Sequence, residues 1–163
     1  MSLNFYDDKC KTITNEIKFG ICDGKNDQNA FLAFGEQPDW ICTVINNSQV
    51  SVEFRAIDHC VIILRNDGNQ ERSCDAMLTY EDNIVFIELK DKAKNWMEDG
   101  IKQIRETLLF FTANHDLSIY RHKRAFVANR KHPHFHFLDA EKKRWFWDNY
   151  KIRMDVQAKI IIK

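Results

Sequence analysis

The chain has 163 residues, of which 44% are hydrophobic and 29% charged, and its formal net charge is zero. This composition is ordinary for a globular protein, and the length suits one domain, 1–163, that can bury a hydrophobic core. No window approaches about 18 uninterrupted apolar residues and the first eight residues are acidic rather than basic, so we expect neither a membrane-spanning nor a secreted protein but a cytoplasmic one.

The cysteines are widely spaced and form no CxxC pair, which argues against a zinc ribbon. An odd number of cysteines without a signal peptide predicts reduced, partly buried thiols. The five cysteines are Cys10, Cys22, Cys42, Cys60 and Cys74.

Residues 1–39 are expected to form an N-terminal extension that packs on the domain. Apolar residues at spacings of three and four predict a short amphipathic helix within residues 7–19. Gly, Asn and Asp then dominate residues 20–37, which predicts a loop, and the apolar run 31–34 would anchor it.

After this loop the sequence pattern changes to one typical of β-strands. Residues 41–45 and 50–57 are rich in β-branched and aromatic side chains, and the Asn-rich segment between them predicts a hairpin. Residues 60–65 are expected to form a third strand, and Asp67-Gly68 predicts the next reversal. The following two strands would then be the fourth and fifth of a meander.

Two apolar runs, 74–80 and 84–90, are separated by a short polar turn and predict a further hairpin. Because side chains alternate across a strand, Glu88 and Lys90 should share one face, about 7 Å apart. Asp75 would join them if the hairpin pairs around this turn. The two carboxylates would form an oxygen-rich pocket of the kind that Mg²⁺ prefers, and the ammonium group could stabilise a phosphate or activate the attacking water.

This arrangement, Asp75 followed thirteen residues later by Glu88-Leu89-Lys90 and then by a helix with Gln103, resembles the PD-(D/E)xK nuclease superfamily. The resemblance covers residues 58–130, with Cys74 in place of the family's proline. It implies an α/β (α+β) fold, a restriction-endonuclease-like mixed β-sheet flanked by helices. It also implies a nuclease that hydrolyses phosphodiester bonds of DNA, or of RNA, with Mg²⁺ or Mn²⁺, and that often works as a homodimer.

The resemblance also assigns roles to individual residues. Asp75, Glu88 and the Leu89 carbonyl would hold the metal, Lys90 would assist the attacking water, and Gln103 would position water or phosphate. These are the predicted catalytic and metal-binding residues.

Several alternatives stay open at this stage. The acid that many family members carry upstream has no clear counterpart, although Glu53 and Asp58 are candidates. The carboxylates and Lys90 could be ordinary charges on an exposed strand, and Gln103 an exposed helix residue. The chain could also be a catalytically inactive nuclease-fold module that binds nucleic acid or a protein, or a small-molecule hydrolase.

Residues 95–111 have the pattern of an amphipathic helix that packs on the sheet. Asn95 is the expected N-cap, and Glu98 would complete a capping box. Gly100 within this helix indicates either close packing against a neighbouring element or only that the helix tolerates a glycine there. The predicted buried face consists of Ile101, Ile104, Leu108 and Phe111.

Residues 120–129 predict a further core strand that is entered through basic residues, and residues 130–136 predict a loop. A helix is expected over 139–150 and a closing strand over 154–162. Histidines at spacing of two in the loop leave a transition-metal site as the alternative. They are His132, His134 and His136.

Charge is uneven along the chain, with a net of −7 over residues 1–113 and +7 over residues 114–163. The basic part could bind nucleic-acid phosphates, or it could be a solvated surface that balances the acidic part. The aromatic residues 145–147 could stack bases or belong to the core. The candidate nucleic-acid-binding residues are Arg121, Lys123, Arg124, Arg130, Lys131, Lys142, Lys143 and Arg144.

Overall fold

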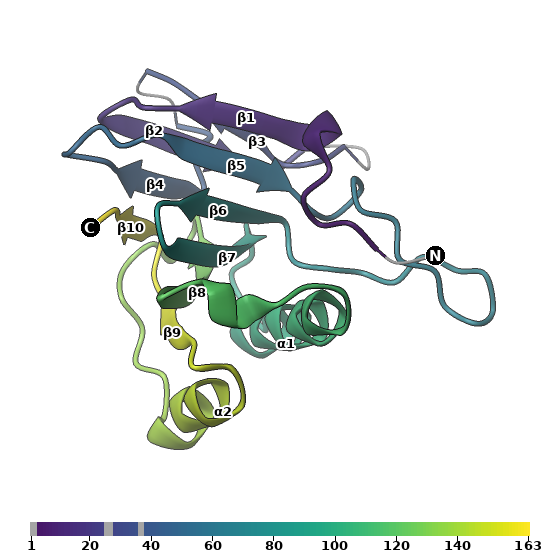
Figure 1. The fold of residues 1–163 in the computed structure, drawn as a ribbon. Helices are drawn as coiled ribbons and strands as arrows, with labels where there is room; N and C mark the ends of the chain where they lie inside the picture. The colour runs from purple at the N-terminus through teal and green to yellow at the C-terminus, as the bar shows by residue number, and fades with distance from the viewer. Residues whose placement is uncertain (1–2, 25–27, 36–37) are drawn as a thin grey trace.

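The computed structural model describes residues 3–24, 28–35 and 38–163. Within these ranges the chain forms two β-sheets and two α-helices, so the predicted mixed α/β class is confirmed (Figure 1). Neither of the helices in the described part of the chain is long and apolar enough to cross a bilayer.

The larger sheet has six strands in the order β1-β5-β6-β7-β8-β9. From β1 to β7 neighbouring strands are antiparallel, whereas β8 runs parallel to β7 and β9 parallel to β8. The strands are β1 (Lys11–Thr14), β5 (Val52–Ala56), β6 (Ala76–Tyr80), β7 (Asn83–Lys90), β8 (His122–Asn129) and β9 (Arg153–Val156).

The smaller sheet has the order β10-β4-β2-β3 and lies against one face of the larger sheet. Side chains such as Phe19, Val44 and Leu78 fill the space between the two sheets. Its strands are β2 (Lys18–Cys22), β3 (Phe31–Ala33), β4 (Cys42–Ile45) and β10 (Lys159–Ile161).

The helices α1 (Met97–Asn114) and α2 (Ala140–Tyr150) pack on the opposite face of the larger sheet (Figure 1). All four apolar residues predicted for the inner face of α1 are buried. The 3₁₀ turns η1 (Asp8–Cys10) and η2 (Leu117–Ile119) precede β1 and β8. The central sheet is therefore covered on both faces, which buries β6 and β7 completely.

Gly100 lies where α1 crosses β8. A Cβ atom at this position would come within 2.7 Å of Val127 Cγ1. The glycine is therefore explained by close packing of helix on strand. The predicted N-cap is wrong, because Asn95 has a left-handed backbone (φ 56°) and the N-cap is the next residue, Trp96, whose side chain makes no capping hydrogen bond.

The predicted helix within 7–19 is also wrong. Only η1 is helical there, and β1 pairs with β5 instead. The apolar residues that suggested an inner helix face, Ile13 and Ile17, are 55% and 52% exposed. Backbone pairing with a neighbouring strand thus outweighs a weak local periodicity. In the predicted loop 20–37, residues 25–27 and 36–37 lie outside the described residues, and β3 occupies the expected anchor.

The predicted strands β4 and β5 are confirmed, but they do not form a hairpin, because the chain crosses from the small sheet to the large one between them. The Asn46 side chain closes this turn through hydrogen bonds with the backbone of Val50. Residues 60–65 form only an isolated bridge, not a strand. The final run divides into β9 and β10, one in each sheet, whereas the strand β8 and the helix α2 agree with prediction.

Cys10 and Cys60 form a disulfide that joins η1 to the segment after β5. The prediction of reduced thiols is therefore wrong for this pair. The other three cysteines are free and buried, as expected for small core residues.

Candidate metal and catalytic site

The hairpin of β6 and β7 places Asp75 beside the end of β7. Ala76 pairs with Ile87, and the Leu89 N–H donates a hydrogen bond of 2.7 Å to Asp75 Oδ2. The carboxyl groups of Asp75 and Glu88 are close enough that each shifts the pKa of the other. The predicted pairing around this turn is confirmed, and it brings the two acids together.

Glu88 and Lys90 share the face of β7 that points toward α1, while Ile87 and Leu89 point into the core between the sheets. Glu88 is 2% exposed and Lys90 is 5% exposed. Lys90 Nζ lies 3.0 Å from Glu88 Oε2. An exposed strand with ordinary surface charges is therefore excluded.

The first turns of α1 complete the surroundings of Lys90. Its Nζ donates to Asp99 Oδ2 at 2.5 Å, and Gln103 Nε2 donates to the same oxygen at 3.4 Å. Gln103 is buried rather than exposed. The Lys90 ammonium group is thus fixed between a strand carboxylate and a helix carboxylate.

A second contact from α1 fixes the start of the hairpin. Thr107 Oγ1 accepts a hydrogen bond of 2.7 Å from the Cys74 N–H and donates one to the Gln103 carbonyl. Helix α1 therefore positions two parts of the site: the segment that carries Asp75 and the ammonium group of Lys90.

Burial shapes the protonation of the two acids. It raises the pKa of Asp75 to about 6, and hydrogen bonds with Glu88 and Leu89 only partly offset it. Burial also raises the pKa of Glu88 well above its ordinary value, and the charge of Asp75 adds to this shift against the opposing effect of Lys90. Near neutral pH and without a metal, the pair is therefore expected to hold one proton.

Lys90 stays charged in this environment. Burial lowers its pKa, but Glu88 and Asp99 outweigh that effect, so the pKa of Lys90 is raised. The hydrogen bond from Lys90 in turn lowers the pKa of Asp99. The site therefore presents a fixed cation next to a carboxyl pair.

The donor set can be tested against a divalent cation. Glu88 Oε1 is buried and has no hydrogen-bond partner among the described residues. A cation between the carboxylates would provide that partner, and Mg²⁺ is commonly held by only one or two carboxylates with water. Within residues 3–24, 28–35 and 38–163 no three His, Cys, Asp or Glu side chains group closely enough to hold a metal. The pair thus fits a hydrated Mg²⁺ or Mn²⁺, not a fully protein-ligated ion.

The two upstream acids that the sequence suggested lie in different places. Glu53 is in β5, where it pairs with Arg55 at 2.9 Å and contacts Thr79. Asp58 follows β5, and its N–H donates to the Cys74 carbonyl next to Asp75. Only Asp58 therefore borders the site.

Sequence reasoning missed two further acids. Asp23 follows β2 and contributes, like Asp58, to the raised pKa of Asp75. Nothing local signals it, because only the packing of the small sheet brings it there. Asp99 had a readable signal: an acid in the first helical turn, nine residues after Lys90.

Comparison with known proteins gives no match. No family model, no curated protein and no solved structure matches the chain. The functional argument therefore depends on the geometry of the chain itself.

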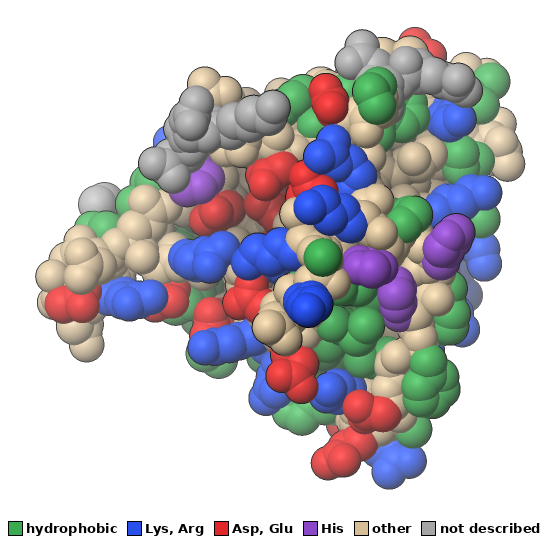
Figure 2. Space-filling model, turned by 180° about the vertical axis from the view of Figure 1, so that it is seen from behind, with side chains coloured by type: hydrophobic (Ala, Val, Ile, Leu, Met, Phe, Trp, Pro, Cys, Tyr) green, Lys and Arg blue, Asp and Glu red, His purple; other side chains and the backbone are tan. Residues whose placement is uncertain are grey.

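One face of the molecule carries acidic side chains beside a group of Lys and Arg side chains, with histidines on either side (Figure 2). The predicted nucleic-acid-binding residues do not form a single patch. Arg130 is paired with Asp91 at 2.6 Å, and Lys143 with Asp155 at 3.6 Å. Lys142 lies 4.0 Å from Glu98 of α1 and 3.6 Å from Asp139, the N-cap of α2, and Lys131 and Arg144 are exposed. The remaining three line a groove at the other end of β8: Arg121, Lys123 and Arg124.

The predicted loop 130–136 and its histidines contribute no ligand group. His132 stacks on Trp96, and His136 contacts the edge of the same ring. Of the three aromatic residues 145–147, Phe146 is buried, Trp145 is partly buried against the core, and Trp147 is 53% exposed. The core interpretation is thus correct for Phe146 and not for Trp147.

Proposed function

We propose that the protein is a Mg²⁺- or Mn²⁺-dependent nuclease that hydrolyses phosphodiester bonds of DNA or RNA. The observation that carries this proposal is the buried Asp75–Glu88 pair, with an unpartnered carboxylate oxygen and the Lys90 ammonium group 3.0 Å from the other oxygen. These are the residue types and spacing of the PD-(D/E)xK superfamily, and a restriction-endonuclease-like arrangement of the sheet is part of the same proposal.

Asp75 and Glu88 would hold the metal, with the Leu89 carbonyl as a further candidate ligand. When bound, the metal would polarise the phosphate and favour ionisation of water. The protein supplies position and charge. Asp75 is aligned by the Leu89 N–H, and Glu88 is held against Lys90.

Lys90 would stabilise the negative charge that develops on the phosphate or orient the attacking water. Its ammonium group is already held between Glu88 and Asp99, so little reorganisation would be needed during reaction. Gln103 acts on Asp99 and thereby on the orientation of Lys90, a role closer to the observed contacts than direct water positioning.

A catalytically inactive module with the same fold is the second candidate. It is favoured by the absence of a third metal ligand among the described side chains and by the proton expected on the carboxyl pair. Such a module would bind a nucleic acid or a protein without turnover.

Metal binding and cleavage separate these two functions. We expect calorimetry to show Mg²⁺ or Mn²⁺ binding to the wild type, and labelled DNA or RNA to be cleaved in either metal. Lys90→Ala should cleave about 10²- to 10³-fold more slowly yet still bind metal, because it removes a stabilising group and a competing cation but no ligand. Lys90→Arg should not restore the rate, since a planar guanidinium does not replace a compact ammonium group.

Lys92→Ala is the matched control, because Lys92 is an exposed lysine two residues further along the chain. It should cleave at the wild-type rate. A wild-type protein that binds neither metal and cleaves neither nucleic acid would refute the enzyme and favour the module. Wild-type activity of Lys90→Ala would refute only the role of Lys90.

A further inference from the structure

A groove of about 710 Å³ is lined by residues of β8, β9, β10 and α2. Phe126 and Ile161 form apolar parts of its lining, and Trp147 comes from α2. Among the described residues that line the groove, Lys and Arg side chains outnumber the single carboxylate, Asp155. The basic side chains are Arg121, Lys123, Arg124, Lys151, Arg153 and Lys163.

None of these six cations has a carboxylate within ion-pairing distance among the described residues. The single acid of the groove, Asp155, is paired with Lys143 outside it. Arg121, Arg153 and Lys163 are exposed, and Lys123 and Arg124 donate hydrogen bonds to oxygens of Tyr120 and Tyr80. Six uncompensated charges in one concave surface attract anions strongly.

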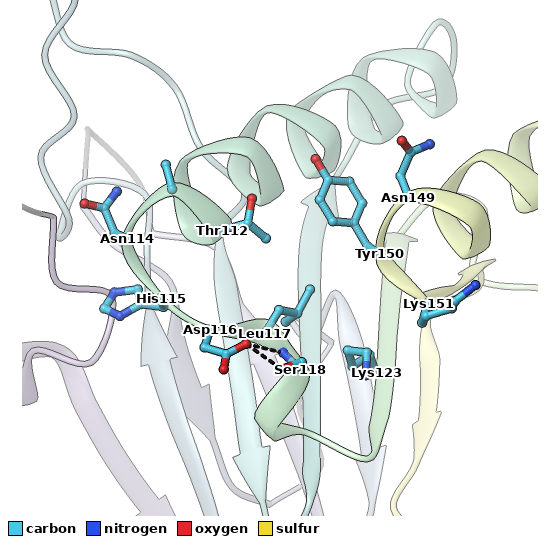
Figure 3. Close-up of a pocket in the computed structure, with 11 residues that line it drawn as sticks. Thr112, Asn114, His115, Asp116, Leu117, Ser118, Lys123, Asn149, Tyr150 and Lys151 are labelled. Atoms are coloured by element: carbon cyan, nitrogen blue, oxygen red, sulfur yellow. Dashed lines mark hydrogen bonds between the residues drawn. The ribbon is translucent and has the colours of Figure 1, made fainter.

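The groove lies next to a second hollow of about 620 Å³, because Lys123 and Lys151 line both. Figure 3 shows this hollow between the last turn of α1, η2 and the end of α2, with the Tyr150 side chain directed from α2 toward α1. The two hollows thus adjoin at this pair of lysines, and together they are called the path. Such a path suits an extended anionic chain better than a single small anion.

Aromatic surface accompanies the charges. Trp147 is 53% exposed, and Lys151 Nζ lies 5.5 Å from the centre of its ring. Tyr150 lines the second hollow and is partly exposed. Exposed rings beside backbone-binding cations are the combination that holds unpaired bases of single-stranded nucleic acids.

We propose that this path binds single-stranded nucleic acid, with the cations on the phosphates and Trp147 stacked on a base. The path lies at the start of β7 and β8, and the carboxyl pair lies at their end. Seven residue steps of about 3.3 Å separate Asn83 in the groove from Lys90, about 23 Å in all. The path is a binding site separate from the carboxyl pair and does not depend on cleavage.

The test measures binding of a fluorescent 20-nucleotide oligothymidylate in EDTA, so that no divalent metal takes part. The double variant Arg121→Ala/Arg153→Ala removes two exposed cations of the groove. It should bind at least about tenfold more weakly, and its salt slope should be shallower by about 1.4, or 0.7 for each lost phosphate contact. The matched control, Lys9→Ala/Lys102→Ala, removes two exposed lysines elsewhere and should bind as the wild type does.

Trp147→Ala keeps every charge and should weaken binding of the single strand about fivefold or more through loss of stacking. Three results would overturn the proposal: no binding by the wild type, equal weakening in the groove and control variants, or tighter binding of a 20-base-pair duplex with no effect of Trp147→Ala. Because no metal is present, loss of cleavage alone leaves these measurements unchanged.

Discussion

Replacement of Glu88 by Gln would separate metal binding from the contribution of this side chain to stability. Gln has nearly the same shape, its amide can donate to Asp75, and its carbonyl can accept from Lys90. The unpartnered oxygen and the repulsion between two buried acids would both disappear. We expect Glu88→Gln to raise the free energy of unfolding of the metal-free protein and to abolish binding of Mg²⁺.

The size of this gain follows from proton linkage. The folded-state pKa of Glu88 lies above its unfolded value, so the wild type loses stability as the pH rises above about 4.3. The loss is at most about 1.4 kcal/mol per pH unit and ends when the pH reaches the folded-state pKa. Gln does not titrate, so the difference between the proteins grows over this window. An unsatisfied buried polar group costs about 1–3 kcal/mol, and we expect a difference of that order at about pH 7.

Urea unfolding in EDTA at acidic and neutral pH measures this difference, and a repeat in Mg²⁺ measures the metal. At about ten times its dissociation constant, Mg²⁺ should add about 1.4 kcal/mol to the wild type and nothing to Glu88→Gln. Glu53→Gln is the control, since Glu53 is paired with Arg55 and the change should destabilise. A Glu88→Gln protein that is less stable than wild type at every pH, or that Mg²⁺ stabilises equally, would refute this reasoning.

Two further changes test the surroundings of the site. Asp75→Asn should flatten the pH dependence of the free energy of unfolding of the metal-free protein. The folded-state pKa of Asp75, about 6, exceeds the unfolded value of 3.8, so the wild type alone should lose about 3 kcal/mol of this free energy between about pH 4 and pH 6. Thermal or urea unfolding measures this loss. Gly100→Ala should lower the free energy of unfolding by about 1–3 kcal/mol, because its Cβ would meet Val127 at 2.7 Å; unchanged stability would contradict close packing there.

The elements with strong local patterns could be predicted from the sequence. The β6–β7 hairpin has a turn signal between two apolar runs, α1 has a clear helical periodicity on its buried face, and α2 begins at a capping residue. The Asp139 side chain, for example, accepts a hydrogen bond from the Lys142 N–H at the start of α2. In residues 7–19 the local periodicity was weak, and the pairing of β1 with the distant β5 decided their conformation. Separation of β4 from β5 is likewise a property of the two-sheet arrangement and not of either strand.

The candidate site, too, could be predicted where the local sequence pattern determines it and not where tertiary packing does. Strand alternation and hairpin register were sufficient to bring Asp75, Glu88 and Lys90 together. Asp23 could not be found, since it comes from the small sheet. The groove could be predicted only in part, because Lys151, Arg153 and Lys163 reach it through the parallel pairing of β8 with β9 and the return of β10.

Helix α1 is attached to the hairpin twice, through Thr107 and through Asp99, so the contacts that form the site join residues close in sequence. The carboxyl pair, the ammonium group and both supporting contacts lie within residues 74–107. Contacts between residues close in sequence form fastest in folding, because little chain entropy is lost in closing short loops. The site is therefore a locally encoded unit of hairpin and helix, whereas the small sheet covers the opposite face of β7 and adds the outlying charge of Asp23.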